Sequence, residues 1–171
     1  MRDLLPDEKV STVFVYTPSM LVRGDLILRE NIRVNIWLRT QGVPNYIHLY
    51  NAQVVQLAGS PPKNYTAQET YVPTPEVIGF HIAPPAQDAL DFDATESNRK
   101  MELVHVLAGS FEMKAKLRIS TSADFASSLD VMNTSWLSLY EAEITNPYLP
   151  QLKLNVPMLL ARPSKLTISL L

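Results

Sequence analysis

Two stretches of the chain are nearly the same, and this likeness is the strongest constraint on how the chain folds. YIHLYNAQVV, residues 46–55, and WLSLYEAEIT, residues 136–145, both begin with an aromatic residue and carry a Leu-Tyr pair at the same place. In both stretches an alanine follows two residues after the tyrosine. A repeat of this kind, if it extends beyond one block, indicates a chain built from two copies of one unit.

Two further pairs of segments match in the same order along the chain. Residues 18–28 align with residues 109–119, and residues 75–82 align with residues 163–170, with apolar positions facing apolar positions in both pairs. The offset between matched residues changes by only a few positions, and small insertions and deletions in loops account for such changes. Three collinear blocks predict an internal duplication. The alternative is that two runs of strands look alike because all strands alternate in the same way.

The duplication sets the expected boundaries of the units. We predict an N-terminal extension at 1–11, a first unit at 12–83, a linker at 84–101 and a second unit at 102–171. The linker begins with two prolines and has several acidic and few apolar residues, which is typical of a segment on the surface.

Each unit is expected to be mainly β. Apolar residues alternate with other residues in several segments, for example at Ile78, Phe80 and Ile82, and a period of two is typical of strands. Units of this length with about five short strands each indicate small β-barrels. Such a barrel is marginally stable alone, because it buries only about 60% of the surface of its extended chain. Two barrels in contact through a strand edge or an apolar face are more stable.

The repeated stretch shows an irregular alternation. Ile47 and Leu49 share one parity, whereas Tyr50, Ala52 and Val54 share the other. A change of parity within a strand indicates a β-bulge or a strand covered on both faces. We therefore predict a central strand here and in the second copy, with room for only a small side chain at the alanine of each.

The two units differ in one segment. In residues 31–45 apolar side chains alternate, which predicts a strand. In residues 122–135, Phe125 and Leu129 share one helical face and Ser122 can cap the helix, which predicts a short helix. Because a duplication predicts one shape for both segments, the choice between strand and helix stays open, with a strand favoured in the first and a helical turn in the second.

Part of each unit resembles a known fold. VRGDLIL, residues 22–28, followed by a strand ending in LYNAQV, residues 49–54, resembles the Sm-like small barrel, in which a strand containing a glycine precedes bent antiparallel strands. It also resembles a group of uncharacterised bacterial domains with an aliphatic-x-Gly and Leu-x-x-Ala-x-Val layout. The resemblance implies two tandem Sm-like or SH3-like barrels that assemble as rings or edge to edge. The RNA-reading loop of the Sm pattern has no match at residues 29–33 or 120–124, so RNA binding is not implied.

Composition argues against several kinds of chemistry. The chain has no cysteine, which excludes disulfides, thiolate metal sites and cysteine catalysis. Its three histidines have no second ligand nearby at a metal-binding spacing, and neither a Gly-x-Ser-x-Gly elbow nor a Gly-rich phosphate loop occurs. We therefore expect no catalytic residue, no cofactor and no metal. A hydrolase whose site assembles only in space is the least favoured alternative.

Charge and hydropathy bound the environment of the chain. The net charge of −2 does not favour a general binder of nucleic acid, which needs a basic surface. The first residues lack the basic and apolar regions of a signal peptide, and no apolar run approaches the ~18 residues of a membrane span. We therefore expect a cytoplasmic protein without a membrane span.

Two functions are compatible with these features. The first is a non-enzymatic scaffold or interaction protein that self-associates through strand edges or binds a protein partner, because the apolar C-terminal segment needs a cover. The expected interface residues are Tyr50, Tyr140, Trp136 and Leu170. The alternative is a module that binds RNA or an anionic ligand through three arginines of the first unit, Arg23, Arg29 and Arg33.

Overall fold

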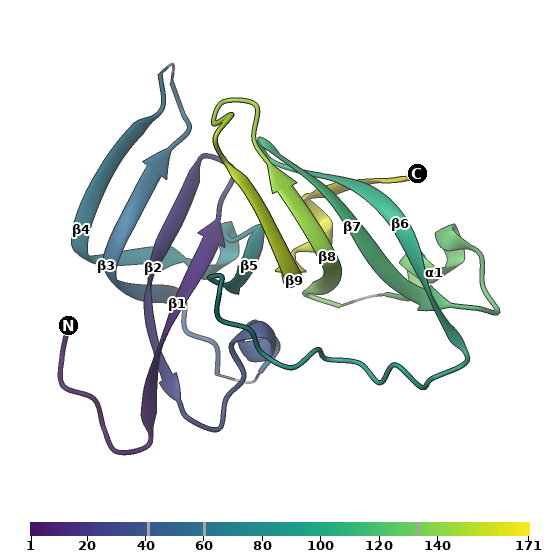
Figure 1. Cartoon of the computed structure of the whole chain (residues 1–171), viewed down its shortest axis with the longest axis horizontal. Helices are drawn as coiled ribbons and strands as arrows, with labels where there is room; N and C mark the ends of the chain where they lie inside the picture. The colour runs from purple at the N-terminus through teal and green to yellow at the C-terminus, as the bar shows by residue number, and fades with distance from the viewer. Residues whose placement is uncertain (41, 60, 133) are drawn as a thin grey trace.

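Strands make up most of the structure, which confirms the prediction of a mainly β chain. The computed structural model describes residues 1–40, 42–59, 61–132 and 134–171 (Figure 1). Its strands are β1 (Glu8–Tyr16), β2 (Met20–Arg29), β3 (Tyr46–Gln56), β4 (Lys63–Pro73), β5 (Gly79–Ile82), β6 (Arg99–Ala108), β7 (Phe111–Ser120), β8 (Leu137–Thr145), β9 (Lys153–Ala161) and β10 (Leu166–Leu170). The helical elements are the 3₁₀ turns η1 (Val34–Arg39), η2 (Thr74–Glu76) and η3 (Pro163–Lys165), and the helix α1 (Phe125–Val131).

All ten of these strands pair in one antiparallel sheet with the order β10-β6-β7-β8-β9-β5-β1-β2-β3-β4. The outer strands are β10 and β4, and within the described residues no pairing joins them. The expectation of two separate closed barrels is not confirmed, because β5 pairs with β1 on one side and with β9 on the other. Hydrogen bonding therefore continues from the first half of the chain into the second, through curved strands that lie side by side (Figure 1).

The two halves contain the same kinds of element in the same order. Residues 8–82 give two strands, a short helical element, two strands, a 3₁₀ turn and a strand, and residues 99–170 give the same series. Within each half the last strand pairs with the first, as β5 does with β1 and β10 with β6. The strands β1 and β6 begin at Glu8 and Arg99, inside the segments predicted as extension and linker.

The bulge predicted in the repeated stretch is confirmed in both halves. The register between β2 and β3 shifts next to Gly24, and the register between β7 and β8 shifts next to Ala115. Opposite these positions Asn51 and Glu141 have left-handed backbone angles, with φ of 49° and 47°. A Cβ atom at Gly24 would lie 3.0 Å from the Cβ of Leu49, so the bulge brings two backbones into close contact.

The choice left open for residues 31–45 is decided against the favoured strand, because the described part of this segment contains the 3₁₀ turn η1. Gln41 lies outside the described residues. Val34, Trp37 and Leu38 follow the i, i+3, i+4 spacing of a helical face, and all three are buried in the core of the first half. Packing of this face, rather than the alternation of apolar residues, decides the local structure.

For residues 122–135 the favoured choice, a helical turn, is confirmed as α1. Its N-terminal cap is Asp124 rather than Ser122: the Asp124 carboxylate accepts a hydrogen bond of 2.7 Å from the backbone N–H of Ser127. This bond is the main reason that the pKa of Asp124 lies below its usual value. Asn133, in the same segment, lies outside the described residues.

Candidate assembly interface

The two halves of the sheet meet where β5 pairs with β9, and this contact is called the junction below. Gly79 lies opposite Ala161 and Phe80 opposite Leu160. The backbone N–H of Arg162 also donates to the carbonyl of Ile78 at 3.0 Å. So short a ladder cannot hold two halves together by itself, and side chains must supply most of the contact.

The strands β8 and β9 cover the core of the first half with the face that points away from the core of the second half. Trp136, Tyr140, Met158 and Leu160 of the second half belong to the same buried cluster as Phe80 and Trp37 of the first half; their relative exposures include 4% for Trp136 and 0% for Leu160. Burial of such side chains is worth about 1.5–3 kcal/mol each. The core of the first half is therefore completed by residues that come from the second half.

Arg162, just after β9, stabilises the junction at one end by contacts to the first half. Its Nε donates to the carbonyl of Val77 and its Nη2 to the carbonyl of Thr74, each at 2.9 Å. The guanidinium also lies over the ring of Trp136, 4.5 Å from its centroid. Burial lowers the pKa of Arg162 from its ordinary value, and the side chain remains charged because that value is far above neutral pH.

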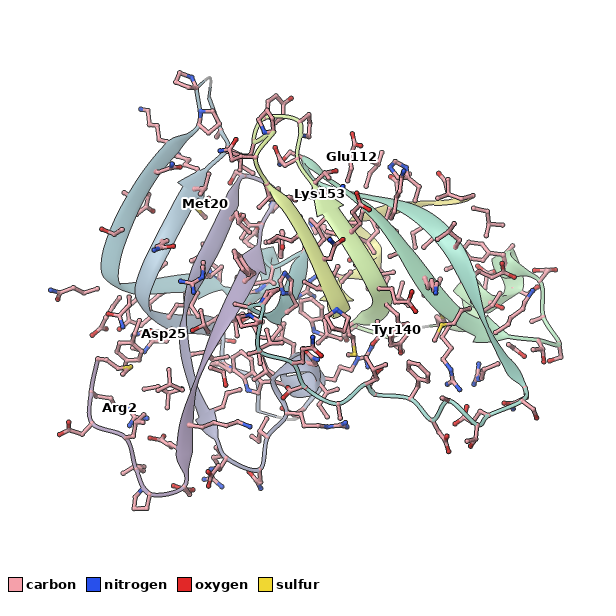
Figure 2. All side chains as sticks on the ribbon, viewed as in Figure 1. Arg2, Met20, Asp25, Glu112, Tyr140 and Lys153 are labelled. Carbon is pink, nitrogen blue, oxygen red and sulfur yellow. The ribbon has the colours of Figure 1, made fainter. Side chains whose placement is uncertain are left out.

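Asp91, in the segment between β5 and β6, stabilises the junction at the other end. Its carboxylate accepts hydrogen bonds of 2.7 Å from Tyr140, labelled in Figure 2, and from Ser138, and it pairs with Arg39 of η1. Burial alone would raise the pKa of Asp91, but these hydrogen bonds outweigh it and lower the pKa. The same Asp91 therefore ties the linker, the first half and the second half together.

A buried Tyr–His pair lies beside the junction. The Tyr16 hydroxyl lies 2.8 Å from Nε2 of His81, and Nδ1 of His81 lies 2.7 Å from the carbonyl of Ile82. Because a carbonyl only accepts, Nδ1 carries the proton, and Nε2 accepts from the Tyr16 hydroxyl. Burial lowers the pKa of His81 to about 4, so the ring is neutral at pH 7, and burial also raises the pKa of Tyr16.

The edge strand β4 exposes an aromatic face at the first end of the sheet. The ring of Tyr71 stacks on His48, with centroids 4.3 Å apart. Glu69 accepts a hydrogen bond of 2.8 Å from the Tyr71 hydroxyl and lies 3.0 Å from Nε2 of His48. These contacts lower the pKa of Glu69, with the Tyr71 hydrogen bond as the largest cause. Tyr71 is 57% exposed although its ring stacks on His48 and its hydroxyl bonds Glu69.

The edge strand β10, at the other end of the sheet, has exposed apolar residues on both of its faces. Leu170 and Leu171 are exposed, as are Leu103 and Leu107 of the neighbouring strand β6. Leu166 and Ile168 are only partly covered by the core of the second half. The corresponding last strand of the first half, β5, is buried along its whole length. The difference arises because β9 covers β5, whereas nothing in the described chain covers β10.

The three arginines predicted to bind an anion do not form one cluster. Arg23 and Arg29 are exposed near opposite ends of β2. Arg29 lies 4.0 Å from Asp7, and Arg33 donates to the carbonyl of Leu90. The structure therefore spreads these charges along the surface.

Two of the predicted interface residues, Trp136 and Tyr140, lie in the junction within the chain. Tyr50 is buried in the first half, and Leu170 is exposed on β10. Sequence patterns did not predict that Asp91, Arg39 and Arg162 act in the junction, because each acts through a partner far away in the chain. The acidic linker and the apolar end of the second unit offered no signal that would assign these contacts.

Among the described residues no helix is long and apolar enough to cross a membrane, and no group of three or more His, Asp or Glu side chains is placed to hold a metal ion. Comparison with protein-family models, with curated proteins and with solved structures finds no match to this chain. The contacts described above are therefore the basis for a functional assignment.

Proposed function

We propose that this chain is a non-enzymatic scaffold protein whose copies join head to tail, with β10 of one copy pairing with β4 of the next. The observation that carries this proposal is the junction itself. There the last strand of one half pairs with the fourth strand of the other half, as β5 does with β9. The strands β10 and β4 are the last strand of the second half and the fourth strand of the first half, and both are edges. One chain therefore has the two surfaces needed to repeat its internal contact.

The registers identify which residues correspond. Phe80 lies opposite Val15 in the first half, and Ile168 lies opposite Val106 in the second, so Ile168 holds the place of Phe80. Val72 lies opposite Ile47, and Ala161 lies opposite Leu137, so Val72 holds the place of Ala161 and Tyr71 that of Leu160. Because Phe80 pairs with Leu160 in the junction, we expect Ile168 of one copy opposite Tyr71 of the next.

Backbone groups on both edges point outward at these residues. Thr74 donates to the carbonyl of Asn45, and in an antiparallel ladder this places the N–H and C=O of Tyr71 on the side away from β3. Leu171 donates to the carbonyl of Leu103, and this places the N–H and C=O of Ile168 on the side away from β6. Ile168 and Tyr71 can therefore exchange two hydrogen bonds.

The side chains support the same contact. Tyr46 and Tyr71, which hold the places of Trp136 and Leu160, are 55% and 57% exposed, whereas Trp136 and Leu160 are buried. An aromatic face is thus exposed in the first half where the second half uses the corresponding face to cover a core. The half-covered apolar residues Leu166 and Ile168 offer the complementary surface.

The contact would not be identical to the junction. Pro73 holds the place of Arg162, so it lacks both the N–H that bonds Ile78 and the guanidinium that bonds Val77 and Thr74. We therefore expect contact between copies to be weaker than the junction and dependent on concentration. A head-to-tail contact between different surfaces closes into a ring or continues as a filament.

The proposal includes an origin for the chain by internal duplication of a Sm-like unit. It is supported by the common order of elements and by the bulge that each half carries next to Gly24 or Ala115. In the first half a glycine-containing strand is followed by a strand with a bulge, as in the Sm-like pattern. A duplicated unit explains why one chain carries both members of a contact that it also makes internally.

The experiment is a mass measurement by light scattering over a range of protein concentrations. We expect the wild-type chain to exceed its monomer mass of 19.2 kDa, and to do so more strongly at high concentration. Ile168→Pro removes an N–H that faces the free edge and leaves the bonds to β6 intact, so it should return the mass to that of the monomer. Ile168→Val, which keeps the N–H, should assemble like the wild type.

Two results would refute the proposal. A constant mass of 19.2 kDa up to millimolar concentration would exclude self-association. Assembly of Ile168→Pro to the same extent as Ile168→Val, with both folded by circular dichroism, would show that β10 does not form the contact.

A further inference from the structure

A pocket of about 620 Å³, called the junction pocket below, lies beside the junction. It lies between η1, the linker and the strands β7 and β8. Apolar side chains line part of it, among them Phe92, Leu117 and Met132. This volume falls in the range of about 300–1,000 Å³ that is typical of sites for small molecules.

One positive charge in the lining, that of Arg99, has no acidic partner among the described residues, because Arg39 pairs with Asp91 and Arg118 with Glu96. The charged side chains that line the junction pocket are Arg39, Arg99, Arg118 and Asp91. Asp91 and Arg39 neutralise each other, and Asp91 is fully occupied by its hydrogen bonds to Tyr140, Ser138 and Arg39. Arg99 is exposed and has no ion-pair partner within the described residues. Its guanidinium is therefore free to bind an anion.

Arg118 is held in position before any ligand arrives. Its guanidinium lies over the ring of Phe92, 5.0 Å from the centroid. Its Nη2 donates to the carbonyl of Asp93 at 3.0 Å and to Glu96 at 2.7 Å, and the side chain is only 17% exposed. Fixing a guanidinium in this way lowers the entropy cost of binding a carboxylate, sulfonate or phosphate.

The first half has a smaller pocket at the corresponding place, and it lacks this arginine. Its volume is about 200 Å³, and Leu26, Ile27 and Tyr50 are part of its lining. In the strand register Asp25 lies opposite Tyr50, and Lys116 lies opposite Tyr140, so Asp25 and Lys116 correspond. Two residues further along the strand, Ile27 therefore holds the place of Arg118. The strand can therefore carry an apolar residue at this position, and the arginine of the second half is not required for the strand to form.

From these contacts we infer that the junction pocket binds a small molecule that combines an apolar ring system with one anionic group. Arg99 pairs with the anion, and Arg118 donates to it from Nε and Nη1, because its Nη2 is used by Asp93 and Glu96. The apolar lining takes the ring system. The site is separate from the free edges β4 and β10, so it does not depend on self-association.

Three probes separate the two parts of this inference. 8-Anilinonaphthalene-1-sulfonate has both the ring system and the anion, N-phenyl-1-naphthylamine has only the ring system, and inorganic phosphate has only an anion. We expect the sulfonate to bind one site per chain with saturable fluorescence. The neutral amine should bind at least about tenfold more weakly because it lacks the charge-assisted hydrogen bond. Phosphate should also bind at least about tenfold more weakly because it buries no apolar surface.

Matched variants locate the binding. Arg118→Ile places the residue of the first half at the corresponding position, and Arg99→Ala changes an exposed residue without risk to the fold. Each should weaken binding of the sulfonate probe by about tenfold. Arg23→Ala, on an exposed position of β2, is the control and should bind as the wild type does.

Any one of three results would overturn the inference. The first is the absence of saturable binding, and the second is equal affinity for the sulfonate and the neutral amine. The third is unchanged affinity for the sulfonate in both Arg99→Ala and a folded Arg118→Ile. If Arg118→Ile does not fold, the result for Arg99→Ala decides alone.

Discussion

The buried Tyr16–His81 pair makes the stability of this protein depend on pH. The pKa of His81 is lowered by burial from 6.5 to about 4 in the folded chain, whereas the unfolded chain has the ordinary value. Between these values the unfolded chain binds more protons than the folded chain. Stability from a neutral His81 is therefore fully present above pH 6.5 and is lost as the pH falls through about 4.

The size of this effect follows from the two pKa values. Relative to pH 7.5, His81 should lower the free energy of unfolding by about 2 kcal/mol at pH 5 and by about 3 kcal/mol at pH 4. The perturbation that isolates it is His81→Gln, because the amide oxygen can accept the hydrogen bond of the Tyr16 hydroxyl but does not titrate.

The assay is urea unfolding followed by tryptophan fluorescence at pH 7.5 and pH 5 for both proteins. Carboxylates that titrate in this range are present in both, so they cancel in the difference. The wild type should lose about 2 kcal/mol more than His81→Gln between the two pH values. Equal losses in the two proteins would show that His81 is not held neutral by burial, and the described geometry of the pair would then be wrong.

Two other perturbations test the packing of the sheet. Arg162→Met keeps a long side chain but removes the hydrogen bonds to the carbonyls of Val77 and Thr74 and the contact over Trp136, so urea unfolding should show a loss of about 2 kcal/mol. A loss below about 0.5 kcal/mol would mean that Arg162 does not fasten the junction. Gly24→Val should lower the free energy of unfolding by about 1–3 kcal/mol, since a Cβ atom would lie 3.0 Å from that of Leu49, and an unchanged midpoint would contradict the close approach at the bulge.

The sequence predicted the features of this fold that depend on neighbouring residues. The parity change between Leu49 and Tyr50 identified the bulge, because a strand must change the face of its side chains where an extra residue is inserted. The spacing of Phe125 and Leu129 identified α1 for the same local reason. Alternation failed at η1, where burial of Trp37 under β5 and β9 overrides the local pattern.

Features that depend on distant contacts could not be predicted. Five strands per half are compatible with a closed barrel or with a shared sheet, and the choice is made by the pairing of β5 with β9. Asp91 lies in a segment that has the composition of a linker, and its role follows only from Tyr140, Ser138 and Arg39, which other segments bring to it. Long-range hydrogen bonds of this kind leave no periodic signal in a single sequence.

The most direct test of head-to-tail assembly is disulfide cross-linking between copies. The chain has no cysteine of its own, so Tyr71→Cys with Ile168→Cys introduces one pair, and these residues are on opposite edges of the sheet. Tyr65→Cys with Ile168→Cys is the control, because Tyr65 is also exposed on β4 but lies away from the expected register.

We expect mild oxidation of the first double variant to give a ladder of dimers, trimers and larger species on a non-reducing gel, and the control to give far less. A first double variant that stays monomeric under conditions in which the wild type assembles, or a ladder equal to that of the control, would contradict the account. So would efficient dimers from Ile168→Cys alone, because they would mean that β10 pairs with β10.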